Sequence, residues 1–445
     1  MSRADFRPFV PLPGQSRISG ATPRAHTAVR LQSPRAADLF GTWAKLAEAP
    51  FKGITTDGVI RPGLFSLEPA DAPTDAMLAA VDMLLRQLSP EQRAKTTFPV
   101  ESRIWQQWQN TENYIEDYGL RLDEVPQPIR DATMAVLQAS LSAKGFEVSR
   151  SVMKLNRFLG DLVGGPEVLG EWAYTFCLFG TPSPSEPWGW QLFGHHLCLS
   201  CLVIGRQMVL TPTFLGAEPV YADAGPFAGT RLFEDEERTG LELMRSLSPQ
   251  QQEIALVSRS MSGNDLPPGR WHFADHLHLG GAHQDNRIVP LEGLRGNGLS
   301  ALQRRNLMDL VSAYVAPLPP GPHAARMNEV ERHLGETHFC WIGGYDEVSP
   351  FYYRIQSPVI FIEFDHHSGV FLTNKEPAKF HVHTLVRTPN GNDYGVDLLR
   401  LHYAHSHAQH GKHHHGDGEH DHHHHHGDGE PHHHHGDGDH GHRHD

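Results

Sequence analysis

The chain has 445 residues and a formal net charge of −14, which is enough length for one large domain or two ordinary ones. Residues 411–445 hold 16 of the 34 histidines, eight acids and two bases, so the rest of the chain carries a net charge of −8. This mildly acidic body has no electrostatic footprint for nucleic acid, and nothing approaches the roughly 18 apolar residues of a membrane span, so we expect neither partner.

The first 35 residues are rich in proline, arginine, serine and glycine and show no periodic apolar pattern. We therefore expect residues 1–35 to form a flexible N-terminal arm. Because the N-terminus lacks the apolar core of a secretory signal, the expected location is cytoplasmic. Four cysteines are too few for a disulfide scaffold. We interpret the CxxC of Cys198 and Cys201 as two small buried residues rather than a redox or zinc pair.

Residues 36–150 have mainly helical patterns. We predict helices over 36–50, 74–88 and 126–143, and the second of them has an apolar stripe at helical spacing. A further helix is expected to begin at Ser89-Pro90, with serine as the N-cap and proline at the first helical position. Between the first two helices, residues 51–65 alternate in polarity and contain Asp-Gly and Pro-Gly turns, which predicts a hairpin.

Two further features of the helical regions stand out. Trp105 and Trp108 lie at helical spacing, which favours a place in the core. VDMLLRQLSPEQR (81–93) and LELMRSLSPQQQ (241–252) share a helix, a Leu-Ser-Pro break and a glutamine-rich helix start. Two copies are too few for a solenoid. A duplicated helical hairpin, or similar helices packed on one sheet, explains them.

From residue 171 onward, short apolar and aromatic runs predict strands. The most prominent run, 188–219, is expected to be one strand through His195 and His196, a turn near Gly205, and a second strand that breaks at Thr211-Pro212. Further strands are predicted over 171–180, 337–346, 350–366, 370–374 and 380–388, and helices over 233–255, 300–315, 324–334 and 396–410.

The fold class we expect is therefore α+β, a mainly antiparallel sheet with helical hairpins packed against it. One large domain is predicted over 36–410, helical over 36–150 and sheet-rich over 171–403. The tail, 411–445, is low in complexity, with histidine runs separated by Gly-Asp-Gly, and we expect it to be disordered and to bind divalent metal ions.

Residues of the kinds that bind metals gather in four places. Two are the adjacent pair His195 and His196 and the His381-Val382-His383 strand, whose two imidazoles share a face. The third is Glu363-Phe364-Asp365, in which both carboxylates share a face, and the last is a loop, 262–296, with His272, His276, His278 and His283. We interpret the loop as a polar lid rather than as a source of ligands.

The first three groups together make a plausible site for Zn, Fe, Ni or Co, with His195 or His196, His381 and His383 as ligands. Only one histidine of the adjacent pair is expected to face the site, and His196 is favoured because its face-mates are the more polar. Glu363 or Asp365 would be a ligand or general base. Arg387 follows the same strand face as the two histidines and would anchor an anionic substrate.

Several blocks resemble the domain of unknown function 3500 family: WGWQLFGHHLCLSCLVIG, TPTFLGAEP, IFIEFDHHSGV and HVHTLVRTPNGNDYGVDLLRLHY. The resemblance covers roughly residues 40–403 and implies no chemistry, since the family has no assigned function. The histidine-rich tail lies outside the family pattern.

The sequence lacks a nucleophile elbow, a phosphate loop and a GxGxxG after a strand, which disfavours serine hydrolases, P-loop NTPases and Rossmann dehydrogenases. The leading hypothesis is a metal-dependent enzyme, hydrolytic or oxidative, acting on a small anionic molecule. The alternatives are a metal-binding, metallochaperone or storage protein that works through its tail, and a metal-free ligand-binding domain.

Overall fold

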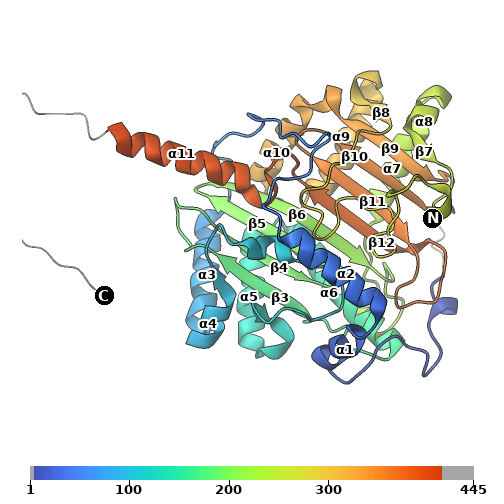
Figure 1. The fold of residues 1–445 in the computed structure, drawn as a ribbon, viewed down its shortest axis with the longest axis horizontal. Coiled ribbons are helices and arrows are strands. Elements are labelled where there is room, and N and C mark those ends of the chain that lie inside the picture. The colour runs from blue at the N-terminus through green and yellow to red at the C-terminus, as the bar shows by residue number, and fades with distance from the viewer. Residues whose placement is uncertain (1–4, 413–445) are drawn as a thin grey trace, which may run out of the picture. The chain divides into compact units, whose positions relative to one another are not determined.

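The structure is a computed structural model that describes residues 5–412. Over that range its strands form one twelve-stranded sheet, in the order β1-β3-β4-β5-β6-β12-β11-β10-β9-β7, with β2 beside β3 and β8 beside β9 (Figure 1). All pairs are antiparallel except β1 with β3 and β7 with β9. The strands are β1 Thr97–Phe98, β2 Leu120–Arg121, β3 Tyr174–Phe179, β4 Trp188–Gly194, β5 Leu197–Ile204, β6 Gln207–Ala217, β7 Leu256–Ser258, β8 Leu294–Arg295, β9 His338–Gly343, β10 Phe351–Gln356, β11 Phe361–His367 and β12 Ala378–Arg387.

Eleven α-helices accompany the sheet in the described part of the chain, which confirms the predicted α+β class. None of these helices combines the length and apolar character needed to cross a membrane. The helices are α1 Pro23–Arg30, α2 Pro34–Ala47, α3 Thr74–Gln87, α4 Pro90–Thr96, α5 Gln127–Ser140, α6 Ala143–Val163, α7 Glu234–Ser246, α8 Pro249–Ala255, α9 Ala301–Val315, α10 Pro320–Arg332 and α11 Val396–Lys412.

The sheet consists of two halves with the same order of elements. In each half, two helices precede two short strands, two more helices follow, and four longer strands complete the unit. The first short strand of each half pairs parallel with the first long strand, and the second pairs antiparallel with it. The last strands of the halves, β6 and β12, join them at the centre of the sheet.

The Leu-Ser-Pro sequence that 81–93 and 241–252 share occurs at equivalent positions in these two halves. Ser89 is the N-cap of α4 and Ser248 is the N-cap of α8, and each forms a capping box with the glutamine three residues later. The structural repeat therefore spans the whole sheet, and the two similar helix starts are the part of it that the sequence shows.

Helices cover one face of the sheet in both halves. In the first half, Trp190 of β4 donates a hydrogen bond to Ser140 of α5 over 3.0 Å. In the second, the hydroxyls of Tyr353 on β10 and Tyr314 on α9 share a hydrogen bond of 2.6 Å.

Two long connections cover the opposite face, and each follows the first short strand of its half, β1 or β7. Gln191 of β4 donates to the carbonyl of Trp105 in the connection 99–119. Glu363 of β11 accepts from the backbone of Leu279 in the connection 259–293. Glu363 and Asp365, two residues apart on β11, share this covered face. Asp365 pairs with His383 of β12, so His381 and His383 lie on the same face.

Several predicted local structures differ from the observed ones. Residues 51–65 contain no strand pair, and Thr55 makes only a single bridge, to Ile288. The segment around Trp105 and Trp108, whose spacing is helical, holds a 3₁₀ helix, Arg103–Gln107, rather than an α-helix. Gly145, just beyond the helix predicted over 126–143, lies in the first turn of the next helix, α6, where a side chain would meet Pro317. Residues 370–374 belong to the loop between β11 and β12 and form no strand.

Residues 5–35 pack on the body instead of forming the flexible arm that we expected. Phe6 is fully buried and makes an edge contact with Phe158 of α6. Thr373 donates a backbone hydrogen bond to Phe9, so the segment also touches the loop after β11. All four cysteines are buried and free, which agrees with the interpretation of Cys198 and Cys201 as small buried residues. The predicted tail lies outside the described residues, apart from its first two positions, which end α11.

Candidate metal centre

The adjacent histidines His195 and His196 form a two-residue turn between β4 and β5. Gly194 pairs with Leu197, so the run expected to be one strand is two. His196 has a φ of +63°, a conformation in which histidine is enriched among non-glycine residues. The next strand, β6, does not break at Pro212 as predicted but continues to Ala217. The backbone N–H of Gly216 on β6 donates to the carbonyl of His196, which fixes the turn against the centre of the sheet.

His381 and His383 of β12 face the imidazole of His196. The Nε2 atom of His381 lies 3.4 Å from that of His196 and 3.2 Å from that of His383. The three ligand atoms all lie within 4.8 Å of one another, and all three side chains are buried. Bonds of about 2.0–2.1 Å at tetrahedral angles place nitrogen ligands about 3.3 Å apart, which the two distances from His381 match. His196 and His383 would have to lie at a similar distance from each other to share an ion such as Zn(II).

In two of these rings, Nδ1, the nitrogen not directed at the other histidines, faces a group that orients the ring. Nδ1 of His381 lies 2.8 Å from the carbonyl of Ser368, which only accepts, so Nδ1 carries the proton and Nε2 keeps its lone pair. Nδ1 of His383 faces Oδ1 of Asp365 at 3.9 Å. Metal-binding histidines ordinarily have such carbonyl and carboxylate partners on the far nitrogen.

Burial also selects the protonation state that binds metal. It lowers the pKa of His381 to about 3, and together with neighbouring imidazoles it lowers the pKa of His196 and His383 well below the ordinary value. All three rings are therefore neutral at pH 7. Three neutral rings with converging Nε2 atoms form a donor set for a metal ion.

His195 lies beside this cluster but outside it. Its ring stacks on that of His196 with centroids 3.9 Å apart, and its Nδ1 lies 2.7 Å from Oδ1 of Asn156 on α6. The structure thus brings His196, rather than His195, to the two histidines of β12.

Asp365 and Glu363 share a strand face but have different surroundings. Asp365 is fully buried, neither of its oxygens has a hydrogen-bond partner among the described residues, and burial raises its pKa to about 7. Its nearest basic neighbours are His278 at 3.4 Å and His383. A buried carboxylate without hydrogen bonds needs an explanation, and here it lies next to the histidine cluster.

Glu363 instead has all its bonds inside the protein. It accepts from the backbone N–H groups of Leu279 and Gly280 and from the hydroxyl of Tyr352. Burial alone would raise its pKa, but His278, these donors and Arg354 outweigh burial, so the pKa lies below its ordinary value. Glu363 therefore holds the connection 259–293 on the sheet as a carboxylate.

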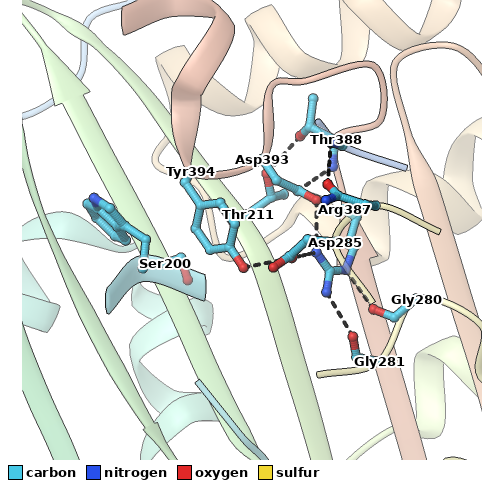
Figure 2. Close-up of polar contacts among 12 residues, drawn as sticks. Ser200, Thr211, Gly280, Gly281, Asp285, Arg387, Thr388, Asp393 and Tyr394 are labelled. Atoms are coloured by element: carbon cyan, nitrogen blue, oxygen red, sulfur yellow. Dashed lines mark hydrogen bonds and ion pairs between the residues drawn. The ribbon is translucent and has the colours of Figure 1, made fainter. Parts of the chain in front are cut away.

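Arg387 has a similar structural part (Figure 2). Its Nε donates to the carbonyl of Gly280 and its Nη2 to that of Gly281. Its Nη1 donates to Asp285 over 2.6 Å and to Asp393 over 3.1 Å. The guanidinium, expected to anchor a substrate, instead joins β12 to the connection above it and to the start of α11, and it does not line the neighbouring cavity.

A cavity of about 490 Å³ leads to the histidine cluster. Residues from the N-terminal segment, α2, both long connections and the loop after β11 line it. They include Arg17, Arg30, Arg35, Phe40, Trp43, Glu112, His195, His196, Trp271, Phe273, Asp275, His276, His367 and His383. The loop 262–296, interpreted from the sequence as a polar lid, supplies part of this lining, and the rings of His276 and His367 stack with their centroids 3.5 Å apart.

The sequence interpretation missed the three arginines of this cavity. They lie in or next to a segment without periodicity, so nothing in the pattern placed them near β12. It also missed Glu218, which accepts from the backbone N–H groups of Val370, Phe371 and Leu372 and thereby fixes the loop whose Ser368 carbonyl orients His381.

The fold and the cluster define an α+β protein with three buried histidines able to hold a metal ion. The chain belongs to the family described as protein of unknown function (DUF3500), whose model matches residues 70–396. This confirms the resemblance seen in the sequence, within narrower bounds than expected. No curated protein and no solved structure matches the chain.

We expect Glu363→Gln to destabilise the fold by about 1–3 kcal/mol at pH 7, because an amide cannot accept all the hydrogen bonds of the carboxylate. The folded pKa is lowered, so this stabilisation is present above the unfolded pKa of about 4.3 and is lost as the pH falls below it. Urea unfolding at neutral and acid pH measures the difference. The exposed Glu376→Gln is the control, and equal stability of both variants at pH 7 would argue against this anchoring.

Proposed function

We propose that the protein is a metal-dependent enzyme, hydrolytic or oxidative, that binds its ion through Nε2 of His196, His381 and His383. The convergence of these three nitrogens at the end of a cavity supports the proposal most strongly. Nitrogen ligands suit Zn(II), Fe(II), Ni(II) or Co(II). Three protein ligands leave a coordination position for water or substrate, as in catalytic rather than structural zinc sites.

The residues around the cluster suit such chemistry. A bound divalent ion would lower the pKa of a water molecule or polarise a substrate oxygen. Asp365, without hydrogen bonds and with its pKa raised to about 7, is the group that we propose exchanges a proton beside the ion. Glu363 and Arg387 have no direct part in the proposal, because protein partners occupy their polar atoms.

The experiment is elemental analysis of a chain that ends at Lys412, measured beside the full chain. The compact unit that contains the sheet ends at His402, so this truncation keeps the body and removes most of the histidine-rich tail. We expect the shortened chain to retain about one ion after desalting. A folded shortened chain that retains none of the four metals, while the full chain binds several ions, would overturn the proposal and favour a protein that works through its tail.

A further inference from the structure

Three arginines gather at the outer part of the cavity, and two of them have no acidic partner. Arg30 lies 3.9 Å from Glu112. Arg17 donates to the carbonyl of Val370, and the guanidinium of Arg35 lies 4.3 Å from the ring of Phe273. Among the described residues, neither Arg17 nor Arg35 forms an ion pair with a carboxylate, and both side chains are exposed at the cavity surface.

The acidic residues of the same cavity are already paired. Glu112 lies 3.2 Å from Nε2 of His26 in addition to its contact with Arg30, and Asp275 lies 3.5 Å from His272. The positive charges of Arg30 and Arg35 disfavour the charged form of Arg17, while the charges of Glu112 and Glu218 favour it. Three like charges held together in this way repel one another, and an anion between them would remove the repulsion.

Part of the remaining cavity wall is aromatic, and contacts within the protein hold it in place. Phe40 and Trp43 come from α2, and Trp271 comes from the long connection 259–293. The ring of Trp43 stacks on His283 and that of Trp271 stacks on His276, so one face of each indole has a partner. Trp271 is nevertheless 39% exposed and lines the cavity.

Resting on the proposed function, we infer that the substrate is a small organic acid: one anionic head group on an apolar body of aromatic size. The head group pairs with Arg17 and Arg35, the body lies against Phe40 and Trp271, and the far end reaches the histidine cluster. A cavity of about 490 Å³ is in the range that holds such molecules. This places substrate recognition on the N-terminal segment and α2, rather than on Arg387.

Binding of a naphthoate ion to the metal-loaded full chain tests the inference. Naphthamide, a neutral molecule of the same shape, and acetate, a head group without the body, are measured beside it by titration calorimetry. We expect naphthoate to bind about tenfold more tightly than either. The double variant Arg17→Gln, Arg35→Gln should weaken naphthoate binding about tenfold and leave naphthamide unchanged. Arg86→Gln, an exposed arginine on α3 that does not line the cavity, is the matched control.

A second arm tests the apolar wall with Trp271→Ala, which should weaken naphthoate but not acetate. Equal affinity for naphthoate and naphthamide, or no effect of the double variant, would overturn the inference. Naphthoate binding that depends on His381 and not on the arginines would also overturn the inference, because the metal ion alone would then bind the acid. Arginine-dependent binding to a folded chain that takes up none of the four metals would support the inference while contradicting the proposed metal centre, so the two can fail separately.

Discussion

His381→Ala is expected to remove the metal ion from the folded body of the protein. His381 is the central member of the cluster, since its Nε2 lies within 3.4 Å of both other nitrogens. Losing a ligand costs more than the about 10–100-fold in affinity that follows the loss of a residue supporting a ligand. Elemental analysis and competition with a chromophoric chelator, both on the chain ending at Lys412, measure the change.

His195→Asn provides the matched control for this variant. His195 is as buried as the ligands and adjacent to one of them, but its ring nitrogen contacts Asn156. An asparagine amide can donate from the same place as Nδ1, so the turn should keep its structure and the chain should keep its ion. Thermal unfolding shows whether each variant is folded. Equal metal content in the two variants would contradict the assignment of His381.

Gly216→Ala is expected to weaken metal binding about tenfold or more without touching a ligand. Gly216 lies opposite His383 in the pairing of β6 with β12. A methyl group there would meet Cδ2 of His383 at 2.9 Å and Cδ2 of His196 at 3.0 Å, so one or both rings must move. Overpacking of this kind also costs about 1–3 kcal/mol of stability.

The control for Gly216→Ala is Gly41→Ala in α2, where an added methyl group meets nothing within 4 Å. That change should leave metal affinity unaltered and raise stability slightly, because alanine is the better helix former. Chelator competition and urea unfolding on both variants separate the effect on the site from the effect on the fold. Unchanged affinity in Gly216→Ala would mean that the ion does not need the observed positions of the two rings.

The sequence predicted the parts of the site that depend on strand periodicity. His381 and His383 are two residues apart on a strand, and Glu363 and Asp365 are two apart on its neighbour, so alternation placed each pair on one face. The observed register sets Asp365 opposite His383, which joins the two faces into one surface.

The turn at His195 and His196 was beyond the sequence interpretation. It contains none of the glycine, asparagine, aspartate or proline that usually mark two-residue turns, and its flanks are as apolar as a strand interior. The choice of His196 over its neighbour was correct as to which residue meets β12, but alternation along a strand was not the reason. The turn itself directs the ring.

The sequence also showed no sign that the two halves of the sheet pair with each other. The two halves of the sheet share their order of elements but little sequence beyond the Leu-Ser-Pro helix starts, so their pairing through β6 and β12 needed the structure. The cluster lies at this junction, with His196 from the first half and His381 and His383 from the second. Folding of the whole sheet is therefore required before the three nitrogens meet.

The most direct test of the metal centre is anomalous X-ray diffraction from crystals of the metal-loaded chain ending at Lys412, recorded at the absorption edge of the retained metal. We predict an anomalous peak about 2.0–2.2 Å from Nε2 of His196, His381 and His383. Full metal content with the peak at any other group of residues, or with these three nitrogens in contact only with one another, would contradict the assignment.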